Sequence, residues 1–227
     1  LDVSNNTALT SLTCGYNLLN ALNVINNNYL RSLSCKYNQI AQLDVSNLDS
    51  LQYFVCRGNQ LSSINVTQNS LLAHFECSQN QIYKLDLAYN PLLNLLYCSF
   101  NNIDSINLSH NPNLAYISCP TNPPLTYLNI KNGNNMNLIM TQGMFGFNNN
   151  PNLFCVTVDD SVWAATNIFT LSFGVDPWLS VSEDCSTFST NVQNIANTIN
   201  EKSITKIVDI LGRQTPYRRN TPLFYIY

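Results

Sequence analysis

Charged residues are scarce in this chain. Aspartate, glutamate, lysine and arginine make up 10% of its 227 residues, against about 25% in typical domains. Residues 1–185 hold 11 acidic and 5 basic side chains, and residues 186–227 hold 2 and 5. Neither segment has the dense basic patch of a nucleic-acid-binding protein. No apolar run approaches the roughly 20 residues of a membrane-spanning helix, so we expect neither a nucleic-acid partner nor a transmembrane segment.

Groups suited to catalysis are also few. The chain has only two histidines, and it lacks a phosphate loop, a dinucleotide fingerprint and metal-ligand spacing. His74, Glu76 and Ser78 alternate along one expected strand, but residues two apart lie about 6.6 Å apart on an open face without oxyanion donors. We interpret Asp159 and Asp160 as solvated turn carboxylates rather than a calcium site. The sequence therefore predicts no enzyme, no metal and no cofactor.

The chain does have a repeat of 21 residues. Six apolar positions of the first unit recur in the later units: Leu1, Val3, Leu9, Leu12, Cys14 and Leu19. A fixed period of this size predicts a solenoid in which each unit is one coil. The alternation in Leu12-x-Cys14 predicts a short strand, and stacked copies would form a parallel sheet on the concave face. Leu1-x-Val3 predicts a second extended segment on the convex side, and no stretch between the two segments has the length or the 3.6-residue period of a helix. Because Leu1 is already a core position and no signal peptide precedes it, we expect an excerpt of a longer protein.

Asparagine, with 37 residues, takes the place of charge and indicates many turns. One column is unbroken, and a second is interrupted by Leu48. An unpaired buried backbone group at a corner costs about 1–3 kcal/mol, and an amide side chain has both donors and an acceptor to satisfy such groups. We interpret both columns as corner residues, with a row of amide ligands as the alternative. The unbroken column is Asn17, Asn38, Asn59, Asn80, Asn101 and Asn122, and the second is Asn6, Asn27, Asn69, Asn90 and Asn111.

Six of the eight cysteines follow the period. They would point the same way from parallel strands about 4.8 Å apart, and parallel Cβ vectors disfavour a disulfide. We therefore predict free, buried thiols that act as small apolar side chains. Cys155 and Cys185 break the register, and we predict a disulfide between them that closes a cap on the last coil. The six ladder cysteines are Cys14, Cys35, Cys56, Cys77, Cys98 and Cys119.

The segment Leu9-x-x-Leu12-x-Cys14-x-x-Asn17-x-Leu19 resembles the leucine-rich repeat, with cysteine in the third leucine position. This resemblance implies an all-β-like solenoid with a parallel sheet on the concave face and an extended, irregular convex side. We expect the solenoid over residues 1–158, with six clear units in 1–127 and degenerate units in 128–158. A cap at 159–185, a linker at 186–203 and a short β appendage at 204–227 complete the predicted organisation.

The end of the chain carries a second resemblance. Val208-Asp-x-Leu-Gly-Arg213 and the strand Leu223-Phe-Tyr-Ile226 are similar to the start of the C-terminal sorting domain of type IX secretion substrates. The later strands of that domain are absent, and a generic terminal hairpin is the alternative. The asparagine-rich, cysteine-ladder repeats also resemble leucine-rich repeat proteins of Bacteroidetes-type bacteria. The resemblance implies export to the extracellular space or the outer surface of a Gram-negative bacterium.

The outward positions of the concave sheet are the predicted binding surface. Aromatic and charged residues gather there in the third to sixth units, and tyrosine and arginine dominate many interfaces. We expect Tyr97 to be the anchor and Arg57 and Glu76 to set orientation, whereas simple strand stabilisation by stacked rings is the alternative. The candidate ligand-binding residues are Tyr53, Arg57, His74, Glu76, Leu95, Tyr97, Phe100 and Tyr116.

These observations favour a non-catalytic recognition or adhesion protein, secreted or attached to the cell surface. It would be a monomer that binds a protein or glycan partner on its concave face. One alternative is a carbohydrate-targeting or spacer module of a larger exported enzyme. Another is a purely structural surface repeat.

Overall fold

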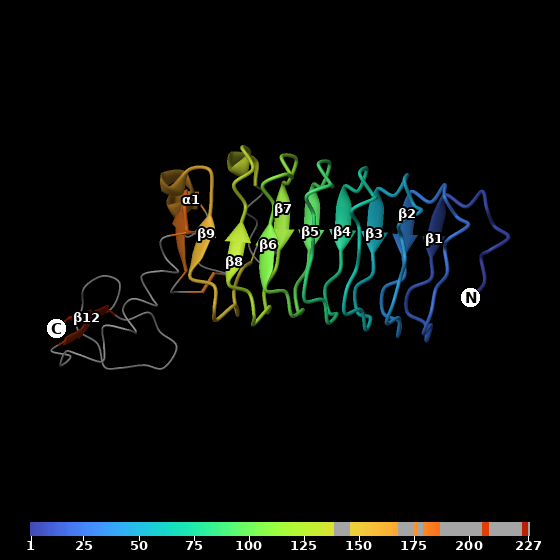
Figure 1. The fold of residues 1–227 in the computed structure, drawn as a ribbon, viewed down its shortest axis with the longest axis horizontal. Coiled ribbons are helices and arrows are strands. Elements are labelled where there is room, and N and C mark those ends of the chain that lie inside the picture. Colours follow the sequence, from blue (N-terminus) through green and yellow to red (C-terminus); the bar gives the residue numbers. More distant parts are fainter. Residues whose placement is uncertain (139–145, 168–174, 177–178, 187–205, 209–223, 227) are drawn as a thin grey trace.

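The computed structural model describes residues 1–138, 146–167, 175–176, 179–186, 206–208 and 224–226. Successive coils stack along one long axis, and the N-terminus lies at one end of the stack (Figure 1). The fold is a leucine-rich repeat solenoid of short parallel strands with little helix. This confirms the fold class that the repeat predicts.

One parallel sheet runs along the first six coils, and we call its outward side the open sheet face. Each strand residue pairs with the residue 21 positions later, on the next strand. Ser11 pairs with Ser32, for example, and Ser32 pairs with Tyr53. The constant period keeps equivalent side chains in register across the sheet. Its strands, in spatial order, are β1 (Ser11–Thr13), β2 (Ser32–Ser34), β3 (Tyr53–Val55), β4 (His74–Glu76), β5 (Leu95–Tyr97) and β7 (Tyr116–Ser118).

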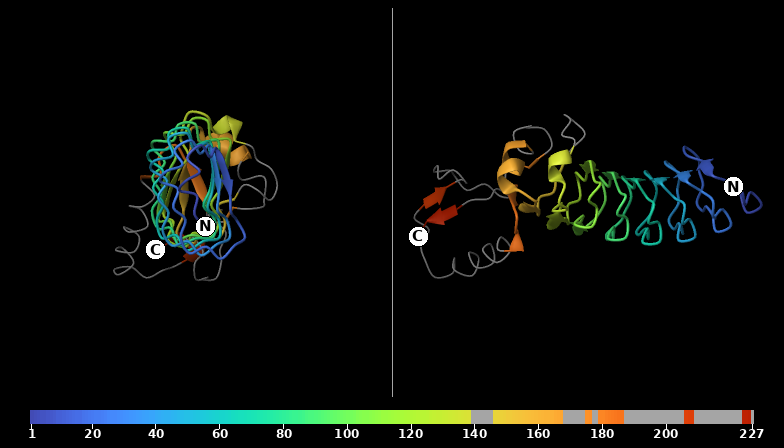
Figure 2. Two further views of the ribbon diagram at one scale, coloured as in Figure 1. Left: turned by 90° about the vertical axis from the view of Figure 1, so that its right-hand side faces the viewer. Right: turned by 90° about the horizontal axis from the view of Figure 1, so that it is seen from above.

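A second parallel sheet covers the opposite side of the core from the sixth coil onward (Figure 2). It forms from the extended segments that the repeat predicts on the convex side. The equivalent segments of the first five coils contain no strand. The second sheet consists of β6 (Ser105–Asn107), β8 (Tyr127–Asn129), β9 (Cys155–Thr157) and β10 (Ser180–Ser182).

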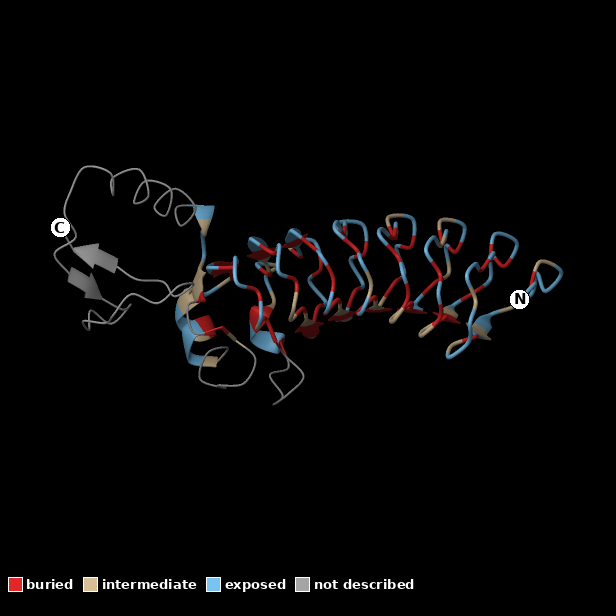
Figure 3. Cartoon of the chain, turned by 90° about the horizontal axis from the view of Figure 1, so that it is seen from below, coloured by how far each residue is buried: buried red, intermediate tan, exposed pale blue. Residues whose placement is uncertain are grey.

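The core is one continuous column between the two sides of the solenoid. Buried residues run along the inside of every coil, whereas the connecting loops are exposed (Figure 3). Leu33, Phe54 and Phe75 from successive coils are fully buried, and the two phenylalanine rings stack with centroids 5.4 Å apart. Each coil therefore buries its apolar side chains against its neighbours.

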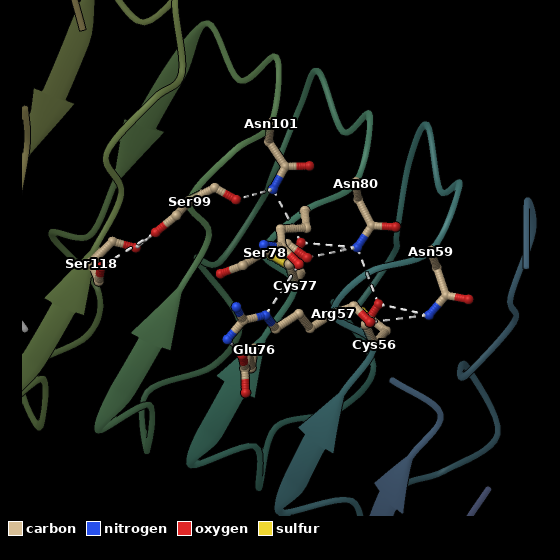
Figure 4. Close-up of polar contacts among 11 residues, drawn as sticks. Cys56, Arg57, Asn59, Glu76, Cys77, Ser78, Asn80, Ser99, Asn101 and Ser118 are labelled. Carbon is tan, nitrogen blue, oxygen red and sulfur yellow. Dashed lines mark hydrogen bonds and ion pairs between the residues drawn. The ribbon is translucent and has the colours of Figure 1, made fainter. Parts of the chain in front are cut away.

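The unbroken asparagine column closes one corner of every coil. The Nδ2 of Asn38 donates to the carbonyl oxygens of Cys14, at 3.0 Å, and Cys35, at 2.9 Å. Its Oδ1 accepts a hydrogen bond from the backbone N–H of Leu19 at 3.0 Å. Asn59, Asn80 and Asn101 repeat the donation to two cysteine carbonyls, and Figure 4 shows this for Asn80 between Cys56 and Cys77. Each amide therefore links two coils.

The second asparagine column is satisfied only in part. The Nδ2 of Asn90 donates to the carbonyl oxygens of Val66, at 3.0 Å, and Asn69, at 2.9 Å. Its Oδ1 is buried and has no hydrogen-bond partner, and the same holds for Asn27, Asn69 and Asn111. Leu48, which interrupts the column, is fully buried. This corner therefore accepts both an amide and an apolar side chain.

The coil after the sixth is longer than the others. Val156 of β9 pairs with Leu128 of β8, a register of 28 rather than 21 residues. Phe147 is fully buried and occupies, in the next coil, the core position that Cys119 occupies in the sixth. Asn150 extends the unbroken column, because its Nδ2 donates to the carbonyl oxygen of Cys119 at 3.2 Å. The region expected as degenerate units therefore includes a complete corner.

The last coil carries the disulfide and the only α-helix among the described residues. Cys155 and Cys185 are joined, with their Cα atoms 5.8 Å apart, as their departure from the register predicts. Helix α1 (Ser161–Asn167) begins after Asp160, whose Oδ1 accepts hydrogen bonds from the first-turn N–H groups of Val162 and Trp163. Such a cap stabilises a helix N-terminus.

Three sequence-based expectations concern the last part of the chain: the turn carboxylates, the β appendage and the linker. Asp159 is not a solvated carboxylate, because it accepts hydrogen bonds from the backbone N–H groups of Gly133 and Asn135, the first residue of the 3-10 helix Asn135–Asn137. Strand β11 (Lys206–Val208) pairs antiparallel with β12 (Phe224–Ile226) within the expected appendage. Residues 187–203 of the expected linker lie outside the described residues.

Candidate functional site

Four neighbouring rings cross the open sheet face from the third coil to the sixth; the first two are stacked and the later contacts are tilted by 36°. We call Tyr53, His74, Tyr97 and Tyr116 the aromatic row. Successive ring centroids lie 4.3, 5.8 and 4.8 Å apart. The register places Tyr53 directly beside His74, whereas Tyr97 reaches His74 and Tyr116 diagonally across the sheet.

The row becomes more buried toward the sixth coil. Tyr53 is 42% exposed, His74 and Tyr97 are half-buried, and Tyr116 is only 4% exposed. Burial, and then the neighbouring Tyr97, raises the pKa of Tyr116 to about 12. Tyr116 was expected on the surface, and it is instead buried against Tyr97 of the neighbouring strand. Leu95, which lies between His74 and Tyr116 in the register, is half-buried.

The centre of the row is neutral near pH 7. Burial lowers the pKa of His74, although the Glu76 carboxylate opposes that shift. The Nε2 of His74 is itself buried without a hydrogen-bond partner. Burial and Glu76 raise the pKa of Tyr97. Ser78, the third member of the set considered for catalysis, is buried.

Arg57 and Glu76 lie beside the row and bind each other. The Nη1 of Arg57 is 3.2 Å from the Oε1 of Glu76 (Figure 4). The Nε of Arg57 also donates to Gln79 at 3.4 Å, and the guanidinium lies 5.5 Å from the ring centroid of Tyr37. These contacts engage both charges, which the sequence-based prediction left free to orient a ligand.

Aromatic side chains also line one margin of the open sheet face. Tyr16 and Tyr37 stack at 4.8 Å, and the Nζ of Lys36 lies 5.3 Å from the centroid of Tyr16. A Cβ on Gly58 would lie 2.5 Å from the ring of Tyr37, so the ring position requires glycine there. Phe100 lies on the same margin and is 53% exposed.

The structure thus brings part of the predicted set into contact. Tyr53, His74 and Tyr97 belong to one row, and Glu76 joins it through its electrostatic effect on the two central rings. The candidate set omitted Lys36 and the Tyr16–Tyr37 pair. Equivalent aromatic residues 21 positions apart, one of them next to a lysine, were the sequence signal for this second cluster.

The cysteine ladder contributes packing. Its six thiols are free and buried. Burial, and then the neighbouring Cys14, raises the pKa of Cys35 to about 12, so its reactive thiolate is rare at neutral pH. Among the described residues, no group of three or more His, Cys, Asp or Glu could hold a metal ion.

A hollow of about 570 Å³ lies away from the open sheet face. Its lining includes Leu22, Leu43 and Ile64, which begin the convex segments of three successive coils. None of the candidate residues lines it. No helix in the described part of the chain is long and apolar enough to cross a membrane.

No protein-family model matches the chain, and no curated protein is significantly similar to it. Solved structures do resemble it. The functional domain of InlJ from Listeria monocytogenes, which includes a cysteine ladder, is 27% identical, with a TM-score of 0.47 over 82% of this chain and 48% of its own. An internalin, InlF, from the same species is 18% identical, with a TM-score of 0.52 over 80% of this chain and 49% of its own.

A leucine-rich repeat protein from Leptospira interrogans is 19% identical, with a TM-score of 0.50 over 79% of this chain and 50% of its own. The chain therefore spans about half the length of these three structures. InlF and the Leptospira protein show the fold that this chain shares.

Proposed function

We propose that this chain is a non-catalytic recognition module whose open sheet face binds a macromolecular partner. The observation that carries the proposal is the aromatic row. Its rings are held by one another and by a regular sheet, so binding costs little conformational entropy. Tyrosine is also enriched among the residues that dominate interface energies.

The centre of the proposed contact is the exposed half of the row. Tyr53 and Tyr97 present surface, whereas the buried Tyr116 packs beside Tyr97 from the next strand. Arg57 and Glu76 fix each other beside the row. Phe100 extends the contact along the margin.

The proposed location is outside the cell, on the surface or secreted. The support is the resemblance of residues 208–213 and 223–226 to a type IX sorting segment of Bacteroidetes-type bacteria. A reporter fused to a complete sorting domain that begins with this segment would test the address in a type IX-competent cell. Equal periplasmic retention with and without the segment would contradict it.

The binding face can be tested with any partner that a binding screen captures, before the chemical identity of that partner is known. The purified protein would first be screened against immobilised surface proteins and a glycan array, and the captured partner titrated. We expect Tyr97→Ala to weaken binding by about thirtyfold, since truncating a central interface aromatic often costs about 2 kcal/mol.

The matched control is Tyr83→Ala. Tyr83 is 58% exposed and lies outside the open sheet face, after the buried Ile82. Circular dichroism would verify that both variants remain folded. Loss of affinity in Tyr83→Ala with full affinity in Tyr97→Ala would place the contact on the other side of the solenoid.

A further inference from the structure

Charge is divided between the two sides of the solenoid. Residues 1–127 contain six acidic residues, and Glu76 is the one that lies on the open sheet face. Three others follow the first residue of a convex segment, where a carboxylate oxygen accepts a hydrogen bond from the backbone N–H two residues later. The five acidic residues away from the open sheet face are Asp2, Asp44, Asp49, Asp86 and Asp104.

The basic residues have the opposite distribution. Of the four in residues 1–127, Lys36 and Arg57 follow strands β2 and β3 on the open sheet face, and Arg31 directly precedes β2. Only Lys84 lies in a convex segment. Arg57 is compensated by Glu76, whereas Arg31 and Lys36 make no ion pair within the described part of the chain. The second coil therefore presents uncompensated positive charge on an acidic molecule.

Lys36 is also held in place. Its ammonium lies over the ring of Tyr16, and Tyr16 is stacked on Tyr37. A cation near an aromatic face is attracted by the negative charge of the ring's π system. This contact restricts the side chain without neutralising its charge, so an anionic partner meets a positioned cation.

The aromatic row indicates which kind of anion fits. A sugar stacks on the flat face of a ring, but His74 is stacked on Tyr53, and Tyr97 is wedged at a tilt between His74 and Tyr116. What these residues offer outward is ring edges and the tyrosine hydroxyl. Ring edges carry the positive part of the aromatic quadrupole, and a hydroxyl donates hydrogen bonds. Both groups suit the carbonyl and carboxylate oxygens of a polypeptide better than the apolar face of a sugar.

We infer that the partner is a protein that presents an acidic segment to the second, third and fourth coils. This inference rests on the proposed function and specifies its partner. Carboxylates of the segment contact Lys36 and Arg31, and its main chain lies along the aromatic row from Tyr53. The acidic residues of the convex side orient the approach, because they repel the same segment from that side.

The test uses a fluorescein-labelled oligoglutamate peptide and its fluorescence anisotropy with the whole chain at about 0.05 M salt, where screening is modest. The decisive comparison is Lys36→Glu against Lys84→Glu. Both variants change the net charge equally, both sites are on the surface, and only Lys36 lies on the open sheet face. We expect the peptide to bind, Lys36→Glu to weaken binding at least tenfold and Lys84→Glu to change it less than twofold.

Equal weakening in the two variants would overturn the inference, because the peptide would then sense net charge alone. Preferential, Lys36-dependent binding of a sulfated polysaccharide, run as a parallel probe, would overturn the choice of a protein. Absence of peptide binding would overturn it as well. None of these results decides the proposed function, since the Tyr97→Ala and Tyr83→Ala comparison depends on the captured partner and not on this probe.

Discussion

Two buried asparagines at two corners of the fifth coil have opposite hydrogen-bond balances. Asn101 donates to the carbonyl oxygens of Cys77 and Cys98, and its Oδ1 accepts from the buried N–H of Ile82 at 3.0 Å. Asn90 donates to two carbonyl oxygens, but its Oδ1 has no partner. Replacing each with leucine, which has nearly the same shape, therefore removes very different sets of interactions.

Asn101→Leu leaves the N–H of Ile82 buried without an acceptor, which costs about 1–3 kcal/mol, and it loses two further hydrogen bonds worth about 0.5–1.5 kcal/mol each. The expected destabilisation is therefore about 4 kcal/mol. Asn90→Leu also loses two hydrogen bonds, but it removes an unpaired oxygen of comparable cost. The carbonyl oxygens that it leaves, those of Val66 and Asn69, still accept backbone N–H groups at 3.0 Å. We expect a change within about 1 kcal/mol.

Thermal unfolding of the two variants, followed by circular dichroism, measures this difference. For a chain of this size, 1 kcal/mol shifts Tm by about 2–4 °C, so Asn101→Leu should lower Tm by roughly 8–16 °C and Asn90→Leu by less than about 4 °C. The buried Leu48 at the corner equivalent to Asn90 supports the second value. Equal shifts in the two variants would refute the claim that hydrogen-bond satisfaction separates the two columns.

Two further changes test the margin and the centre of the open sheet face. Gly58→Ala should destabilise by about 2–3 kcal/mol, because the new Cβ meets the ring of Tyr37 at a φ of 66°. The control Gly133→Ala has a φ of 80° but nothing within 4 Å, and should cost only about 1 kcal/mol; equal urea midpoints would refute the ring contact. His74 has a folded-state pKa below its unfolded value, so its contribution is fully present above pH 6.5 and is lost as pH falls toward the folded pKa. Urea titrations at pH 7 and pH 5 should show a smaller acid loss in His74→Gln, and an unchanged loss would contradict this linkage.

The sequence predicts the fold well because each coil repeats one simple physical requirement. A core side chain at Leu33 and a corner amide at Asn38 recur at fixed spacing, and every copy meets the same neighbours. The period fails where one coil is longer, and the core position after Cys119 passes to Phe147. The signal for this step was Phe147-x-x-Asn150, which keeps the spacing of Cys119-x-x-Asn122 despite the lost register.

The candidate site is less predictable because periodicity shows which side chains point outward but not how far each of them is buried. It identifies Tyr53, Tyr97 and Tyr116 as outward side chains. It cannot show that Tyr116 is covered, or that Arg57 and Glu76 bind each other instead of a ligand. Such details depend on how neighbouring side chains of different size share one surface, which no single repeat contains.

The margin of the open sheet face shows why large side chains there need an explanation beyond the fold. In each of the first six coils the residue before the corner asparagine is left-handed, with φ between 53° and 66°. Only the third coil uses glycine, at Gly58, although any other residue costs about 1–2 kcal/mol in this conformation. Tyr16, Tyr37 and Phe100 carry that cost at the edge of the surface proposed for binding. At Tyr37 this conformational cost is partly offset by the contacts of its ring with Tyr16 and with the Arg57 guanidinium. Phe100 has neither a ring nor a cation against it in the described residues, so its exposed ring is free to extend the surface that we propose for binding.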